Sequence, residues 1–207
     1  MKTLVGADDA TVEDIVCEPF VSVASSLSQA ERAVEIARSG AQKLVLIRAL
    51  IRLARIHYRL GRYDIAQTLA DEALSLTDAR TPERADAWQV LANCAADMGA
   101  LSQAEAYYRV AADLARETGY RRAQVAALHG LAAGAYYPRG CFELALAADA
   151  EARRIAVEEG CTEWLIYPLI TTALIYQVTG QSQLAHATLD ELAALAPAGS
   201  VAQGCQL

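Results

Sequence analysis

Apolar side chains recur every three to four residues along most of this chain, as they do on one face of a helix. Two such stripes lie on either side of Gly99. The first comprises Trp88, Leu91, Ala92 and Ala95, and the second comprises Ala104, Tyr108, Ala111 and Leu114. Because a glycine permits the backbone to reverse where a side chain would crowd it, this segment predicts an antiparallel helical hairpin.

The hairpin pattern repeats along the sequence. Gly61, Gly99, Gly140 and Gly180 recur at spacings of 38, 41 and 40 residues. A period of about 40 residues in an alanine-rich chain with few strand formers predicts a helical solenoid. A half unit precedes the first glycine, since the sequence from Leu27 nearly duplicates that from Leu101. We therefore expect about four and a half hairpins over residues 27–195, between an arm or degenerate helix (1–26) and a flexible tail (196–207).

Three details of the pattern lead to local predictions. The spacing of 41 contains one extra residue, which we assign to the YYPRG turn before Gly140. Pro168 is expected in the first turn of its helix, where a missing N–H costs little. Solenoids need polar terminal caps, and the tail lacks one. This leaves two alternatives open: docking to other domains of a longer chain, or a homodimer.

The best-defined unit resembles the tetratricopeptide repeat. The matching residues are Trp88, Leu91, Ala92, Gly99, Ala104, Tyr108 and Ala111. The resemblance implies an all-α fold, a right-handed superhelical solenoid of antiparallel helical hairpins. It also implies a non-catalytic scaffold that binds a protein or peptide. The long period is similar to that of the arrays in bacterial ATP-dependent transcriptional activators of the maltose-regulator type, so we expect the interaction module of a regulatory protein.

The composition argues against two classes of partner, nucleic acids and membranes. A net charge of -7 argues against direct nucleic-acid binding, because binding to phosphates needs a basic surface. The most apolar stretch, about thirteen residues from Trp164, is shorter than the roughly 20 that a membrane span needs. No signal peptide is recognisable at the N-terminus. We therefore expect a cytoplasmic protein with no membrane partner.

Catalytic and metal-binding motifs are not apparent in the sequence. The five cysteines form no CxxC pair, and the three histidines show no carboxylate partner at metal-ligand spacing. Phosphate-binding glycine loops are also absent. We therefore expect no catalytic residue, no cofactor and no metal. His57 is interpreted as a packed and satisfied imidazole, and Cys94 and Cys141 as small apolar residues.

The resemblance implies a set of binding residues, because the first helices of tetratricopeptide hairpins line a concave groove. The corresponding positions here are Arg48, Arg52, Arg55, Tyr58 and Arg59 in the first full unit, Asp86, Gln89, Asn93 and Asp97 in the second, His129, Tyr136 and Tyr137 in the third, and Tyr167, Ile170, Leu174 and Gln177 in the fourth. Tyr108 is expected in the core, and Tyr137 in the groove or the turn.

Arginines at one end of this set share a helical face. Arg48, Arg52, Arg55 and Arg59 follow the spacing i, i+4, i+7, i+11, and like charges at such spacings repel. An acidic group should therefore lie opposite. One hypothesis is an acidic peptide or terminal carboxylate, and the other is internal pairing with Asp86 and Asp97 or with another domain.

Two further functions remain open. A sensor that binds a small effector should enclose one pocket near Tyr136, Tyr137 and Tyr167. A homo-oligomerisation module should instead associate through an uncapped end of the array.

Overall fold

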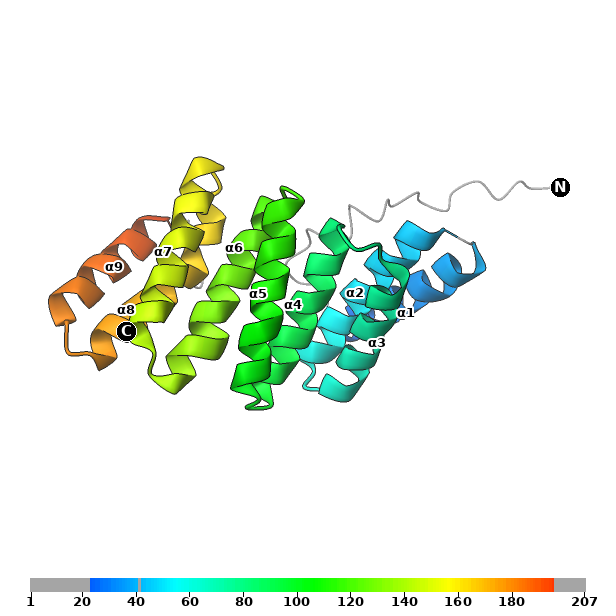
Figure 1. The fold of residues 1–207 in the computed structure, drawn as a ribbon, viewed down its shortest axis with the longest axis horizontal. Helices are drawn as coiled ribbons and strands as arrows, with labels where there is room; N and C mark the ends of the chain where they lie inside the picture. Colours follow the sequence, from blue (N-terminus) through cyan, green and yellow to red (C-terminus); the bar gives the residue numbers. More distant parts are fainter. Residues whose placement is uncertain (1–22, 41, 196–207) are drawn as a thin grey trace.

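The computed structural model describes residues 23–40 and 42–195, and within them the chain is an array of helices without strands. Figure 1 shows the helices following one another from α1 on the right to α9 on the left. The array begins with α1 (Val23–Ser39), α2 (Lys43–Arg59), α3 (Tyr63–Leu76), α4 (Pro82–Asp97) and α5 (Leu101–Glu117). It continues with α6 (Arg121–Gly130), η2 (Leu131–Tyr136), η3 (Tyr137–Arg139), α7 (Phe142–Glu158), η4 (Thr162–Leu165), α8 (Ile166–Val178) and α9 (Ser182–Leu195).

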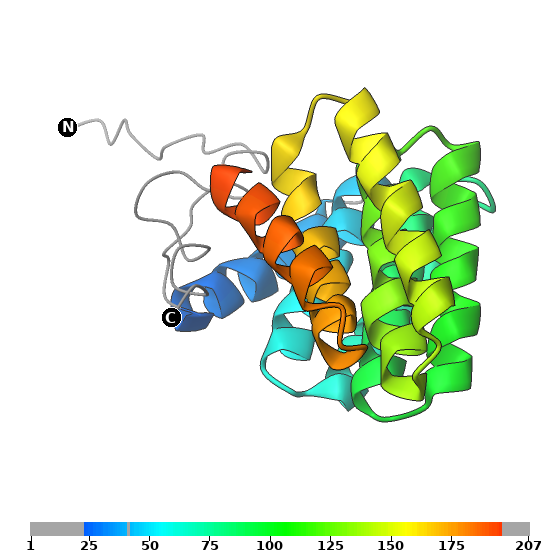
Figure 2. The ribbon, with the colours of Figure 1, turned by 90° about the vertical axis from the view of Figure 1, so that its left-hand side faces the viewer.

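The helices pair as the sequence period predicts. α2 with α3, α4 with α5, α6 and η2 with α7, and α8 with α9 form four hairpins, and α1 supplies a half unit before them. The end-on view in Figure 2 shows α1 and α9 pointing in different directions, because successive hairpins are rotated relative to one another. The prediction of an all-α superhelical solenoid of antiparallel hairpins is therefore confirmed.

Small side chains fill the contacts between helices. The buried positions of the second helices are mostly alanines, including Ala66, Ala70, Ala73, Ala104, Ala111, Ala145 and Ala152. Their lack of bulk allows neighbouring backbones to approach closely, so burial is achieved without a large aromatic core. Ala104 is fully buried, as expected of a helix contact.

The turn glycines share one hydrogen-bonded geometry. Gly61 and Gly140 both have φ 70°, in the left-handed region that favours glycine. The N–H of Gly61 donates to the carbonyl of Tyr58, and the next N–H, of Arg62, donates to the carbonyl of His57. The same pair of bonds recurs at Gly99, Gly140 and Gly180. These are Schellman caps, which satisfy the last carbonyls of each first helix and reverse the chain.

The extra residue of the third unit does not lie in its turn, so our assignment to YYPRG is wrong. The cap at Gly140 is the same as at the other turns, whereas residues Leu131–Tyr136 form a π-helix. There the N–H of Tyr137 donates to the carbonyl of Ala132, five residues earlier. A π-helical segment holds one more residue than the α-helix it replaces. The insertion is therefore absorbed one turn upstream of the glycine.

The ends of the array add three observations. Pro168 lies in the first turn of α8, as predicted. The predictions for residues 1–22 and 196–207 fall outside the described residues, and α1 begins at Val23, within the segment assigned to an arm or degenerate helix. Among the described residues, no helix combines the length and apolar character needed to cross a membrane.

Tyr108 closes the contact between the second and third units. It is 3% exposed, and its hydroxyl donates to Oδ1 of Asn93 at 2.6 Å. A Cβ atom added to Gly130 would lie 2.2 Å from the ring of Tyr108, and one added to Gly134 would lie 2.9 Å from its hydroxyl. The two glycines therefore make the room that this buried ring occupies. Tyr108 is a core residue, as predicted.

Candidate functional site

The predicted groove residues lie on what we call the first-helix face. It comprises the sides of α2, α4, α6 to η3, and α8 that carry residues 48–59, 86–97, 129–137 and 167–177. The residues at its two ends differ in charge and in partners.

At the α2 end, arginines of the stripe already have acidic partners. Arg48 forms an ion pair with Glu83 at 2.9 Å, and Arg55 forms one with Asp86. The hypothesis of internal pairing is therefore correct for Asp86, and Glu83 is a partner that the sequence reasoning missed. Arg48 and Arg55 are at least one-third exposed, so each pair contributes little to stability. These two guanidinium groups no longer require an acidic ligand.

Asp97 does not pair with the arginine stripe, contrary to our expectation. Its Oδ2 accepts a hydrogen bond from the hydroxyl of Tyr63 at 3.3 Å. The ring of Tyr63 lies 6.0 Å from that of Tyr58. Burial and the neighbouring Asp97 carboxylate raise the pKa of Tyr58 to about 12. The residues thus form a small tyrosine–carboxylate group between α2, α3 and α4.

The centre of the face is largely engaged in packing. Asn93 accepts the hydroxyl of Tyr108, and Gln89 is half-buried. Tyr136 is 6% exposed, and its hydroxyl accepts from Arg109 at 2.9 Å. Tyr136 therefore belongs to the contact between α5 and η2. The resemblance implied an exposed groove residue at this position, and the structure does not place one there. Its neighbour Tyr137 lies in the turn.

His129 on α6 contacts a carboxylate that the sequence reasoning did not identify. Its Nδ1 lies 3.1 Å from Oδ1 of Asp149 on α7, which is 0% exposed. The other oxygen, Oδ2, has no hydrogen-bond partner among the described residues. Burial raises the pKa of Asp149 to about 6, against the opposing influence of His129. Asp149 lies twenty residues from His129 in the sequence, so it was not among the carboxylates considered at metal-ligand spacing.

A signal for this contact is present in the repeat register. Asp149 follows Ala145 by four residues, as Tyr108 follows Ala104. Since Tyr108 was expected in the core, the same register places Asp149 there too. A buried carboxylate requires a polar partner, which points to the preceding first helix and its only imidazole.

At the α8 end, the first-helix face is apolar and open. Tyr167 is 66% exposed, Leu174 43% and Val178 57%. Together with the half-buried Ile170 they form what we call the α8 row, spaced i, i+3, i+7, i+11 along one side of the helix. The sequence of α8 contains no charged residue. Gln177 is exposed beside the row, and the ring of Tyr167 lies 5.9 Å from that of His129.

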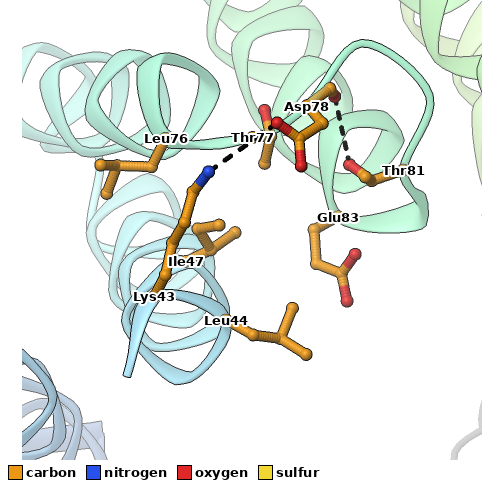
Figure 3. A pocket seen from close by; sticks show the side chains of 8 residues that line it. All are labelled: Lys43, Leu44, Ile47, Leu76, Thr77, Asp78, Thr81 and Glu83. Atoms are coloured by element: carbon orange, nitrogen blue, oxygen red, sulfur yellow. Dashed lines mark hydrogen bonds and ion pairs between the residues drawn. The ribbon is translucent and has the colours of Figure 1, made fainter. Parts of the chain in front are cut away.

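Two hollows, of about 170 and 340 Å³, are the best formed in the described part of the chain. The best-formed one, of about 170 Å³, lies between the start of α2 and the α3–α4 loop (Figure 3). Leu44 and Ile47 line it from α2, and Lys43 reaches toward Asp78 at 3.8 Å. Pockets for small molecules usually enclose about 300–1,000 Å³. Neither this hollow nor the next, at the Gly180 turn, includes the tyrosines expected for a small effector.

Two other side chains that could carry chemistry, those of His57 and Cys94, are internal. His57 is buried, as predicted, but its Nδ1 has no partner among the described residues, so it is packed without being satisfied. Burial and the nearby Arg62 lower the pKa of His57. Cys94 is fully buried as a small apolar residue. Within the described ranges, no three His, Cys, Asp or Glu side chains gather as a metal site.

Known structures are similar to this chain in fold. No family model matches the sequence, and no curated protein matches it either. Two crystal structures of a kinesin light chain-like protein from Podosopora anserina with nearly identical TPR-like repeats are each 20% identical in sequence to this chain. Each similarity covers 84% of this chain and 86% of the other chain, and the TM-scores are 0.61 and 0.59. BtubC (BKLC) from P. vanneervenii is 17% identical over 85% of this chain and 91% of its own, with a TM-score of 0.55.

The fold is a TPR-like helical repeat. Identities this low establish the architecture alone.

Proposed function

We propose that this protein is a non-catalytic scaffold that binds a protein segment or peptide along its first-helix face. We further propose that it is the interaction module of a bacterial regulatory protein, acting in the cytoplasm. The observation that carries the binding proposal is the α8 row, an exposed apolar surface on a helix without charge. Exposed apolar surface rimmed by polar residues is typical of interaction sites.

The position of the hollows favours an extended partner over a small effector. A peptide contacts several hairpins and needs no enclosed pocket, whereas a small molecule must be largely surrounded. The first-helix face extends over four hairpins, and neither of the two best-formed hollows includes its tyrosines. Since Arg48 and Arg55 have internal partners, an acidic partner is not part of the proposal.

A selection experiment tests the proposal. Short random peptides displayed on phage would be selected against the full chain, and the enriched peptides would be measured by fluorescence anisotropy. Leu174→Asp places a charge in the α8 row, and Leu144→Asp places one at a comparably exposed leucine on α7, outside the first-helix face. We expect Leu174→Asp to weaken binding at least about tenfold, while Leu144→Asp stays within about twofold.

Two results would contradict the proposal. One is that no peptide is enriched by the wild-type chain. The other is that the enriched peptides lose affinity equally with Leu174→Asp and Leu144→Asp, which would show that they bind away from the first-helix face.

A further inference from the structure

No Lys or Arg follows Arg154 in the sequence, and α8 contains no charged residue. Of the acids after Arg154, Glu158, Glu159 and Glu191 form ion pairs with Arg154, Arg121 and Arg153, whereas Glu163 and Asp190 form none among the described residues. The chain after Arg154 therefore supplies no guanidinium or ammonium group of its own to the α8 row. In contrast, six Lys and Arg residues occur between residues 41 and 63, around α2.

The His129–Asp149 pair adds a local preference for a hydrogen-bond donor. Asp149 accepts from Nδ1 of His129 when the proton lies on that nitrogen, which leaves Nε2 of the neutral ring as an acceptor. His129 is partly exposed, and it lies beside the exposed ring of Tyr167. An acceptor next to an open aromatic face suits a guanidinium or ammonium group, which can donate to one and stack on the other.

Asp149 strengthens this preference from inside the array. It is fully buried, and its Oδ2 has no partner among the described residues. A carboxylate whose charge is incompletely compensated in a poorly solvated place attracts a cation more strongly than a surface carboxylate does. Asp149 does not reach the surface, so it acts through His129 as a positioning residue.

The α8 row continues from this point as an apolar surface. Ile170, Leu174 and Val178 follow Tyr167 along the same side of the helix. Tyr167 and His129 therefore lie at the N-terminal end of this apolar surface, and Val178 lies at its C-terminal end.

We infer that the α8 row recognises a peptide segment in which one Lys or Arg side chain lies against Tyr167 and His129, and neighbouring apolar side chains pack on Leu174 and Val178. This inference rests on the proposed peptide-binding function and adds the chemistry of the partner.

Three labelled synthetic peptides of equal length test it. They share an apolar core and differ at one position, which holds Arg, Gln or Glu. Affinities for the full chain would be measured by fluorescence anisotropy at physiological salt. We expect the Arg peptide to bind about tenfold more tightly than the Gln peptide, and the Glu peptide to bind most weakly.

Variants separate the cation position from the apolar strip. Tyr167→Ala should remove the preference for Arg over Gln, whereas Tyr167→Phe should retain it, because both rings offer an aromatic face. Asp149→Asn should reduce the same preference without weakening the Gln peptide, a change that a purely structural role would not produce. Leu144→Ala on α7 is the control and should change none of the affinities.

Three results of the peptide measurements would overturn the inference. They are equal binding of the Arg and Gln peptides, tightest binding of the Glu peptide, and no binding of any of them. The proposed function is decided separately by the phage selection. If selected peptides depend on Leu174 but contain no Lys or Arg, the peptide-binding function stands and the cation preference is wrong.

Discussion

Tyr108 and Asp149 occupy the same position in consecutive second helices, four residues after a buried alanine, yet their surroundings differ. Tyr108 fills the space made by Gly130 and Gly134, and its hydroxyl is bonded to Asn93. Asp149 contacts His129 with one oxygen, while the other is unpartnered among the described residues. The first junction is filled and satisfied, and the second is polar and incompletely satisfied.

The comparison shows that a repeat position fixes burial but does not fix chemistry. Burial of an incompletely partnered carboxylate costs free energy, so the residue at the second junction is not the one that stability would favour. Asp149 contacts His129, whose ring lies beside Tyr167 of α8. The exposed side of that first helix is apolar and uncharged. Under the proposed function, stability and recognition thus belong to different junctions of one array.

The largest effect is expected at the first junction. Tyr108→Ala should lower the free energy of unfolding by about 3–5 kcal/mol, because it empties a filled space and leaves Asn93 without its donor. Asp149→Ala at the matching position should cost much less, since the carboxylate it removes is poorly partnered. Urea denaturation of the two variants measures the difference, and equal losses would show that the two junctions are alike.

A smaller effect of opposite sign is expected for Asp149→Asn. The pKa of Asp149 is raised from 3.8 to about 6, and each unit corresponds to about 1.4 kcal/mol. The ionised carboxylate is therefore destabilising in the folded state, so at about pH 7 the variant should unfold with a free energy higher by on the order of 2–3 kcal/mol.

The pH dependence makes this prediction specific. The cost of the ionised form is complete at about pH 7, decreases as the pH falls through 6, and is lost below about pH 4, where the carboxyl becomes protonated in the unfolded chain as well. The gain from Asp149→Asn should shrink accordingly in urea unfolding at about pH 4.5. Asp190→Asn, at an exposed carboxylate of α9, is the control. A gain that is independent of pH would disprove the assigned cause.

The smallest effect concerns the fit between Tyr108 and Gly130. Gly130→Ala should destabilise the wild-type chain by about 1–3 kcal/mol, because the new Cβ would lie 2.2 Å from the ring. In the Tyr108→Ala background the same change should be neutral or stabilising by up to about 1 kcal/mol, since alanine favours the helix. A double-mutant cycle measured by thermal and urea unfolding detects the reversal, and additive effects would exclude the contact.

The sequence was sufficient for the architecture because its determinants are local and repeated. The turn glycines adopt the left-handed conformation at each predicted reversal, and the alanine stripes pack where the period places them. The extra residue of the third unit was assigned to the wrong place because an insertion changes the spacing of the motifs without marking where it lies. The choice between a longer turn and a π-helix depends on hydrogen bonds that the spacing does not show.

The candidate site was less predictable because it depends on contacts between units. The pairing of Arg55 with Asp86 followed from opposite charges on neighbouring first helices. The bond of Asp97 to Tyr63, on a second helix, did not, and neither did the burial of Tyr136 behind Arg109. The His129–Asp149 contact was accessible from the repeat register. The assignment of the first-helix face as a binding surface stays a prediction.

The π-helical segment Leu131–Tyr136 has a consequence for how such arrays change length over generations. A single-codon insertion in a helix normally rotates every later side chain by about 100° and would misalign the hairpin that follows. Here the widened coil takes up that rotation before the cap at Gly140, so the downstream alanines keep their phase. The first helix of the third unit thus holds one extra residue, and repeats of unequal length stack in one continuous array.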